Sequence, residues 1–166
     1  MSASLTTTEH AAVIRDTLKR DHGWTSRQVS VRAEYFSLGS SITVIVKDPA
    51  IPLPVIKAIA EQAERIRRDG FGEILGGGNR YVSVSYNRET LAIMGRRYAD
   101  AVQRAVQTVA IGIPSLATIE GTPFFVGRPD DYRFTLWEDS YLNQSNTVDG
   151  LAEIIGALMI ARECQT

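Results

Sequence analysis

The segment 35–48 limits the fold of this 166-residue chain more than any other. Its second half, 41–47, alternates apolar and polar residues, and so does the segment 28–36; Val, Ile, Thr and aromatic side chains are prominent in both. Alternation with a period of two is typical of β-strands that bury one face. Small residues separate the two segments, so we expect an antiparallel hairpin with its turn at 37–40.

A helix is predicted on each side of this hairpin. A capping-box pattern at 6–9 and apolar residues at helical spacing predict a helix over about 7–21, which Gly23 is expected to stop. Three prolines follow the hairpin, and a second apolar stripe predicts a helix over 54–70. The segment 80–86 alternates again, which predicts a third strand.

The second half of the chain is predicted to hold a long helix, three strands and a closing helix, at 88–109, 117–120, 122–126, 132–138 and 148–163. The first two strands are expected to turn at Glu120-Gly121. The inward stripe of the long helix is predicted to consist of Leu91, Met94, Tyr98, Val102, Ala105 and Val109. Asn146 is the expected N-cap of the closing helix. The fold class is therefore α+β. We expect an α-β-β-α-β unit over 1–87 and a helix with a small β-rich unit over 88–166, packed into one globule.

Charge is distributed unevenly along the chain, although the formal net charge is only -1. Lys and Arg exceed Asp and Glu by three over 79–110, whereas Asp and Glu exceed Lys and Arg by five over 111–166. A sequence pI of about 6.1 argues against a protein that coats nucleic acid, because phosphate neutralisation needs a strong basic excess. The charge distribution and the pI are still compatible with a local basic patch on the long helix.

Cysteine and histidine usage excludes several site types. Cys164 is the only cysteine, so neither an internal disulfide nor a cysteine-rich metal site is expected. His10 and His22 are too far apart in sequence for a helical metal-binding pair. No signal peptide or membrane-spanning stretch is recognisable, which predicts a cytoplasmic protein without membrane contact. We assign no catalytic residue, metal ligand or cofactor.

The small residues Gly39, Ser40 and Ser41 form the first candidate binding site. Their backbone amides and two hydroxyls would lie at the entrance of a strand, where they can bind an anion or the backbone of a partner. The alternative is an ordinary hairpin turn, in which such residues are common.

A glycine-rich loop, Gly76-Gly77-Gly78-Asn79-Arg80, is the second candidate. Its glycines allow a partner to approach the backbone closely, and Arg80 is able to hold a phosphate or carboxylate through two hydrogen bonds. The loop leads into a strand rather than a helix, so it is not a P-loop. The alternative is a flexible connection between two elements.

Arginines and tyrosines provide the third candidate surface. Arg96, Arg97 and Arg104 are predicted on the outer face of the long helix, where they can meet nucleic acid or an acidic protein. Tyr35 and Tyr81 lie near the two glycine-containing segments and can stack on bases. The alternatives are a solvated helix face and ordinary strand packing.

Four segments together resemble a known family: 9–20, with its Ile-Arg-x-x-Leu-Lys pattern, Val29-Ser-Val-Arg32, Tyr35-Phe-Ser-Leu-Gly-Ser-Ser-Ile42 and Asn79-Arg-Tyr-Val-Ser-Val-Ser85. Over about 8–88 the chain resembles the large polyvalent protein-associated domain 29, a domain of phages and conjugative elements. Where that family tends to carry aromatic-Thr-Asp-Gly-Pro, this chain has Val46-Lys-Asp-Pro49. The resemblance implies a mobile-element setting in a bacterial host and no particular reaction.

Three functions are compatible with these observations. The first is a non-enzymatic binding protein of phage or mobile-element origin that inhibits a host defence system, such as CRISPR, through protein–protein contact. The second is a nucleic-acid-binding accessory module that uses Arg80 and the arginines of the long helix. The third is a binder of a small phosphorylated ligand, or an enzyme, that uses Ser40, Ser41 and Arg80. A homodimer is compatible with pairing along the edge of the strand 81–86.

Overall fold

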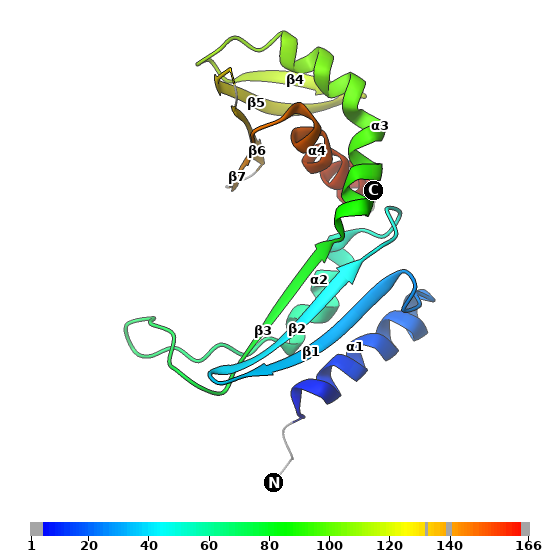
Figure 1. The fold of residues 1–166 in the computed structure, drawn as a ribbon, viewed down its shortest axis with the longest axis vertical. Helices are drawn as coiled ribbons and strands as arrows, with labels where there is room; N and C mark the ends of the chain where they lie inside the picture. Colours follow the sequence, from blue (N-terminus) through cyan, green and yellow to red (C-terminus); the bar gives the residue numbers. More distant parts are fainter. Residues whose placement is uncertain (1–4, 132, 139–140, 164–166) are drawn as a thin grey trace. The chain divides into compact units, whose positions relative to one another are not determined.

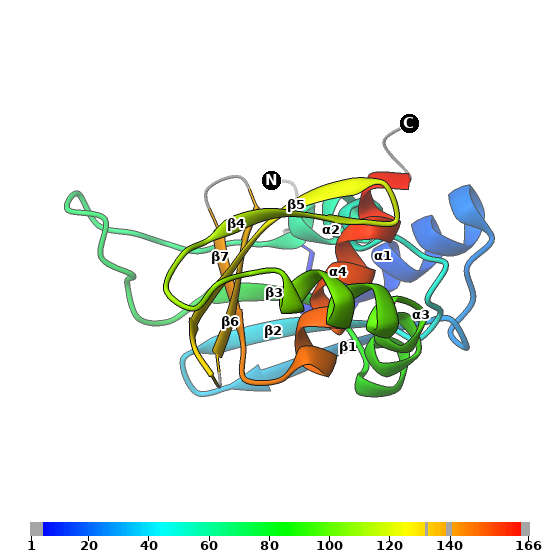
Figure 2. The same cartoon turned by 90° about the horizontal axis from the view of Figure 1, so that it is seen from above.

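The computed structural model describes residues 5–131, 133–138 and 141–163. Helices and sheets follow one another in the predicted order, so the α+β fold class is confirmed. The chain divides into two compact units, Met1–Asn87 (unit 1) and Arg88–Thr166 (unit 2). Figures 1 and 2 show the ribbon of each unit from two directions.

Unit 1 contains α1 (Thr7–His22), β1 (Val29–Phe36), β2 (Gly39–Val46), α2 (Leu53–Ala60), the short 3-10 helix η1 (Glu61–Ala63) and β3 (Asn79–Tyr86). The sheet has the order β1-β2-β3. β1 and β2 form the predicted antiparallel hairpin, and β3 pairs parallel to β2 after the crossover through α2. β2 is therefore the central strand.

Local signals set the ends of α1 as predicted. The Thr6 hydroxyl accepts the Glu9 amide, and the Glu9 carboxylate accepts the Thr6 amide at 2.7 Å, which completes the capping box. These hydrogen bonds to Thr6 lower the pKa of Glu9. Gly23 ends the helix at φ 71°, in the left-handed region that favours glycine.

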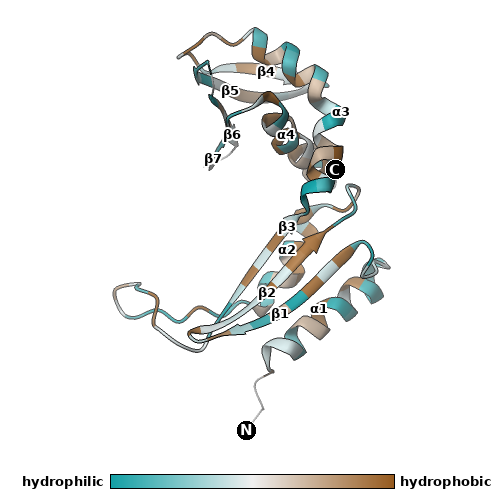
Figure 3. Cartoon of the chain, viewed as in Figure 1, coloured by the Kyte–Doolittle hydropathy of each residue, from teal (hydrophilic) through white to brown (hydrophobic). Residues whose placement is uncertain are grey.

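One face of the unit 1 sheet is covered by both helices, which also contact each other. Its core contains Ala11, Ile14, Leu18, Val29, Val31, Ile42, Val44, Val46, Ile56 and Ala60. Strand residues with the opposite orientation, such as Arg32 and Ser83, are exposed. Figure 3 shows the corresponding mixture of hydrophilic and hydrophobic residues along α1 and the strands.

Two predicted boundaries in unit 1 are wrong. The hairpin turn consists of Ser37 and Leu38 alone, so Gly39 and Ser40 belong to β2. The helix predicted over 54–70 ends at Ala60 with one 3-10 turn after it. Its continuation is extended because Arg65 exchanges two backbone hydrogen bonds with Arg80, at 2.9 and 2.7 Å.

The segment 64–78, which we call the arm, runs away from the unit 1 sheet as a long loop (Figures 1 and 2). Its start covers part of the free edge of β3. Besides the Arg65 bridge to Arg80, a Glu64 carboxylate oxygen accepts the Val82 amide at 3.4 Å. Pairing of a second copy along this edge stays a prediction.

Unit 2 contains α3 (Arg88–Gln107), β4 (Ser115–Ile119), β5 (Thr122–Asp130), β6 (Arg133–Glu138), β7 (Tyr141–Ser145) and α4 (Val148–Glu163). The four strands form an antiparallel sheet in sequence order. Glu120 and Gly121 form the predicted turn between β4 and β5, both with positive φ, as a type I′ hairpin turn requires.

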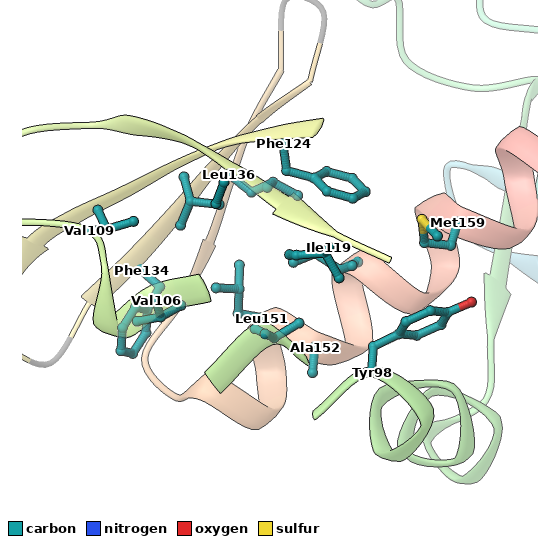
Figure 4. Close-up of a cluster of buried hydrophobic side chains, with 14 residues drawn as sticks. Tyr98, Val106, Val109, Ile119, Phe124, Phe134, Leu136, Leu151, Ala152 and Met159 are labelled. Atoms are coloured by element: carbon teal, nitrogen blue, oxygen red, sulfur yellow. The ribbon is translucent and has the colours of Figure 1, made fainter. Parts of the chain in front are cut away.

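The core of unit 2 lies between the sheet and its two helices. It gathers Tyr98, Val102, Val106, Val109, Ala117, Ile119, Phe124, Val126, Phe134, Leu136, Leu151, Ala152, Ile155 and Met159. Figure 4 shows side chains from α3, the sheet and α4 converging in this core. Most of the apolar stripe predicted for α3 therefore faces the core.

Three predictions for unit 2 need correction. The strand β7 was not predicted, because its sequence is mostly polar. Thr147, rather than Asn146, caps α4, since its hydroxyl accepts the Gly150 amide at 3.0 Å. α3 ends two residues earlier than predicted. Tyr132, the first residue of a predicted strand, and Cys164 lie outside the described residues.

Candidate functional site

The end of unit 1 where β2 and β3 begin holds most of the predicted binding residues. A shallow depression of about 380 Å³ is lined there by Thr7, Tyr35, Phe36, Ser37, Gly39, Ser40, Gly78, Asn79 and Arg80. Strand register explains this arrangement, because Ser40 lies opposite Tyr35 on one side and Arg80 on the other. Directly opposite side chains share one face of a sheet, so these three form a single row.

Gly39 is required for strand pairing rather than for a turn. A Cβ at this position would lie 2.6 Å from the carbonyl oxygen of Asn79 in β3, which is closer than atoms approach without displacement. Its φ is not positive, so backbone strain is not the reason for glycine. The glycine lets the backbones of β2 and β3 come together at the start of both strands.

The two serines after Gly39 face opposite sides of the sheet. Ser40 is buried, and its hydroxyl lies 2.7 Å from the Thr7 hydroxyl and 3.4 Å from the Asn79 carbonyl oxygen. Ser41 is half-buried and lies opposite Tyr81, in the neighbouring row of the other face. The pair therefore does not act as one hydroxyl cluster, and the Ser40 hydroxyl ties β2 to α1.

Arg80 is held by its own unit. Its Nε donates to the Thr7 hydroxyl at 3.2 Å, Nη1 to the Ala63 carbonyl at 2.9 Å and Nη2 to the Leu5 carbonyl at 3.2 Å. Three of the five guanidinium N–H groups are thus used to join the start of α1 to the end of η1. The charge of Arg80 also reaches His10, whose pKa is lowered first by burial and then by this guanidinium.

Tyr35 and Tyr81 lie on opposite faces at this end of the sheet. The exposed Tyr35 hydroxyl is 3.3 Å from both the amide and the hydroxyl of Thr8, and hydrogen bonds from Thr8 lower the pKa of the phenol. The ring of Tyr81 stacks on Phe36 with centroids 6.3 Å apart. The ring of Tyr81 therefore already has a stacking partner, whereas the ring of Tyr35 is 63% exposed and only its hydroxyl is held.

Asn79 closes the base of the arm. It is buried, its Oδ1 accepts the Arg67 amide at 2.8 Å, and its Nδ2 donates to the Leu75 carbonyl at 2.7 Å. The Leu75 amide donates back to the Arg67 carbonyl at 2.9 Å. Gly77, another predicted residue, contributes a carbonyl 3.5 Å from the Arg67 Nη1. A single side chain therefore joins both sides of the arm at its root.

The tip of the arm is a second ordered feature. One carboxylate oxygen of Asp69 accepts the amides of Phe71 and Glu73, at 2.9 and 2.8 Å, and the Asp69 amide donates to the Glu73 carbonyl at 2.9 Å. Arg68 Nη1 also donates a hydrogen bond to the Gly72 carbonyl at 2.8 Å. Phe71 is 97% exposed on this turn. The sequence reasoning missed it, although an aromatic residue between two glycines after an aspartate is the signal of such a turn.

The predicted arginines of the long helix lie in unit 2. Arg96, Arg97 and Arg104 are exposed on α3, as expected. Arg96 shares a small depression with Asp149 and Glu153, and Arg104 shares another with Glu120. Arg97 lies over the Tyr98 ring, 5.2 Å from its centroid. Carboxylates line the same depressions as two of these arginines, so the face is mixed in charge.

Neither a metal site nor a membrane span is found in the part of the chain that the structure describes. There, three or more His, Cys, Asp or Glu side chains do not gather where a metal ion would fit. Helices within the described ranges are too short or too polar to cross a bilayer. Comparisons with protein families, with curated proteins and with solved structures found no match to this chain.

Proposed function

We propose that this chain is a non-enzymatic binding protein that contacts another protein through the arm, with Phe71 as the anchor. The exposure of Phe71 on a turn fixed by Asp69 is the observation that supports this function most. A large aromatic side chain that enters a pocket typically supplies much of the energy of a protein interface. Because the turn is already ordered, little conformational entropy is lost on binding.

The charges of the arm favour a protein partner over a nucleic acid. Arg65, Arg67 and Arg68 are exposed, but Glu64, Asp69 and Glu73 lie in the same segment. These charges cancel, whereas phosphate binding depends on a clear excess of cations. A protein surface with an apolar pocket and polar surroundings suits such a mixed arm.

The biological setting of the proposal comes from the resemblance of residues 8–88 to a domain of phages and conjugative elements. A small protein that binds without catalysis is suited to stoichiometric inhibition. We therefore propose a host defence component as the partner and a bacterial cytoplasm as the place of contact.

The contacts of Arg80 and Ser40 weigh against the phosphorylated-ligand function, and a binding experiment tests the nucleic-acid function. A phosphate clamp needs donors that face a ligand, but three Arg80 donors bind protein atoms and the Ser40 hydroxyl is buried. A nucleic-acid module would bind generic DNA or RNA with steep salt dependence, lost on reversing Arg96 and Arg97. Absence of binding at low salt would exclude it.

The test is quantitative affinity capture from a bacterial host lysate with the full chain as bait. We expect one protein to be retained by the wild type and lost with Phe71→Ala. Leu38→Ala is the matched control, because Leu38 is also an exposed apolar residue of unit 1 but lies in the β1–β2 turn. Retention of the same proteins by Phe71→Ala and the wild type would contradict the proposal.

A further inference from the structure

A second depression of unit 1, of about 330 Å³, lies between α1 and β1, which run beside each other (Figure 1). Core side chains form its floor: Leu18 from α1, and Val29 and Val31 from β1, are all buried and line it. The half-buried Trp24, from the loop that joins the two elements, lines it as well. These residues do not line the depression at the start of β2 and β3, so the two are separate places on the unit.

The wall formed by Trp24 is fixed by contacts within the loop. The Trp24 amide donates to the Leu18 carbonyl at 3.1 Å, and the His22 ring stacks on the indole with centroids 4.4 Å apart and an angle of 11° between the rings. The Gln28 amide donates to the Thr25 carbonyl at 2.9 Å and closes the loop. The apolar lining is therefore preformed, as it usually is in small-molecule sites.

Two cationic side chains of α1 lie at the rim. Arg15 and Lys19 both line the depression and are four positions apart, so they share one side of the helix. Arg15 Nε and Nη2 donate to the Val31 carbonyl at 3.3 and 3.0 Å, which holds the guanidinium against β1 and leaves three of its five N–H groups. Within the described ranges, no carboxylate forms an ion pair with either cation. Like charges at this spacing repel each other, so an anion that meets both would be stabilised.

The rim also contains the carboxylate of Asp16. This residue lies four positions before Arg20, whose pKa is raised first by its hydrogen bond with Asp21 and further by the charge of Asp16. Two cations and one carboxylate leave the rim with a net charge of +1. A single negative charge is the complement of such a rim.

We propose that this depression binds a small monocarboxylate with an apolar body about as large as one aromatic ring. Arg15 and Lys19 hold the carboxylate through charge-assisted hydrogen bonds, and the floor and Trp24 take the apolar body. A phosphate ester brings a second negative charge that the rim does not match. A neutral ligand leaves both cations without a partner.

The size of the depression limits the ligand. Small-molecule sites measure about 300–1,000 Å³, so about 330 Å³ lies at the lower end of that range and suits a single ring with a short acidic side chain. A ligand of that size reaches a dissociation constant of about 1 mM or less. The site contains no residue of the arm, so it is independent of the proposed function.

Tryptophan fluorescence tests the proposal with 3-phenylpropionate as the probe. The chain has two tryptophans, and Trp137→Phe leaves Trp24 as the only one. We expect a saturable change in the Trp24 emission of this full-length variant, with a dissociation constant of about 1 mM or less. The neutral 3-phenylpropionamide and the body-less acetate should each bind at least about tenfold more weakly. No saturation up to about 20 mM, equal binding of the amide, or tighter binding of phenyl phosphate would overturn the proposal.

Substitutions at the rim test the two cations in the same variant. Arg15→Gln should weaken binding of 3-phenylpropionate about tenfold, and Lys19→Gln about threefold or more. Lys19→Gln keeps the test decisive if Arg15→Gln fails to fold, because the Lys19 side chain has no ion-pair partner among the described residues. Arg27→Gln is the control, since Arg27 is an exposed cation of the same loop as Trp24 but does not line the depression. Wild-type binding by both rim variants, or an equal loss with Arg27→Gln, would overturn the proposal.

The carboxyl end of a peptide offers the same chemical group as the free acid. The comparison is therefore made with the tripeptide acetyl-Gly-Gly-Phe, whose extra residues exceed the volume of the depression. We expect it to bind no more tightly than 3-phenylpropionate. Clearly tighter binding of the tripeptide would assign the site to a protein terminus and overturn the proposal of a small ligand.

Discussion

Gly156 in α4 lies directly against the carbonyl group of Met94 in α3. A Cβ added to Gly156 would lie 2.9 Å from that carbonyl oxygen and 3.0 Å from its carbon. On the same helix pair, a Cβ added to Gly95 would lie 3.1 Å from the Glu153 amide nitrogen. The absence of side chains at these two positions sets how closely α3 and α4 approach.

Gly156→Ala is therefore expected to destabilise unit 2. Alanine favours a helix over glycine by about 1 kcal/mol, but forcing a methyl group into a filled contact costs about 1–3 kcal/mol. We expect a net loss of about 1 kcal/mol in the free energy of unfolding, measured with urea. Gly76→Ala is the control, because nothing lies within 4 Å of its Cβ and its φ is not positive. A Gly156→Ala protein more stable than the wild type would contradict this contact.

Tyr98→Phe is expected to stabilise the protein. The Tyr98 side chain is fully buried, and its hydroxyl has no hydrogen-bond partner among the described residues. Removing an unsatisfied buried hydroxyl should raise the free energy of unfolding by about 1 kcal/mol. Tyr86→Phe provides the contrast, because the Tyr86 hydroxyl donates to the Ile51 carbonyl at 2.6 Å. That variant should lose about 1 kcal/mol, and equal effects of the two substitutions would contradict the assignment.

The same tyrosine predicts a dependence of stability on alkaline pH. Burial raises the pKa of Tyr98 above the value of about 10 that a phenol has in an unfolded chain. The Tyr98 phenol contributes its full share to the free energy of unfolding below about pH 10. This share declines as the pH rises toward the pKa of Tyr98 in the folded protein, because the phenol of the unfolded chain loses its proton first. Urea unfolding at about pH 8 and pH 10.5 should show the advantage of Tyr98→Phe over the wild type increasing. If the stability advantage of Tyr98→Phe over the wild type decreased between these two pH values, the raised pKa of Tyr98 would be contradicted.

Arg80→Gln tests whether the guanidinium acts as a structural tie. The substitution removes hydrogen bonds to Thr7, Ala63 and Leu5, and we expect it to lower the free energy of unfolding by about 2 kcal/mol. Arg32→Gln, an exposed change on β1, should stay within about 0.5 kcal/mol of the wild type. If both variants unfolded like the wild type, Arg80 would be available for a ligand.

Asn79→Ala should open the arm. Its loss leaves the Arg67 amide and the Leu75 carbonyl without partners at the root, so the segment 64–78 should separate from β3 more often. Limited trypsin digestion, followed by mass spectrometry, should show faster cleavage within the arm than in the wild type. Asn79→Asp should also open the arm, because its buried carboxylate keeps the acceptor for Arg67 but places negative charge against the Leu75 carbonyl oxygen. Unchanged cleavage would contradict the role of Asn79.

The parts of the fold that sequence predicted correctly depend on neighbouring residues. The capping box at Thr6, the left-handed stop at Gly23 and the Glu120-Gly121 turn each involve atoms a few positions apart. The helix after Pro52 was overestimated because its end depends on Arg65 pairing with Arg80, fifteen residues later. Periodicity in the intervening sequence contains no information about that pairing.

The sequence predicted which residues meet at the candidate site, but not which hydrogen bonds they already make. Tyr35, Gly39, Ser40, Asn79 and Arg80 do meet, since the register of three strands aligns them. Which donors are already used could not be read from the sequence, because the partners of Arg80 and Ser40 come from α1 and η1. Phe71 was missed although the turn that carries it has a local signal, because the sequence does not show that its side chain is left exposed.

The parallel pairing of β2 with β3 decides where unit 1 can be shortened. β2 carries the fully buried Ile42, Val44 and Val46, and the Asn87 amide closes its far end by donating to the Val46 carbonyl at 3.0 Å. A recombinant fragment that stops before Asn79 would leave one entire side of its most apolar strand open to other chains. Such fragments should collect in inclusion bodies, and the smallest usable piece of unit 1 extends through residue 87.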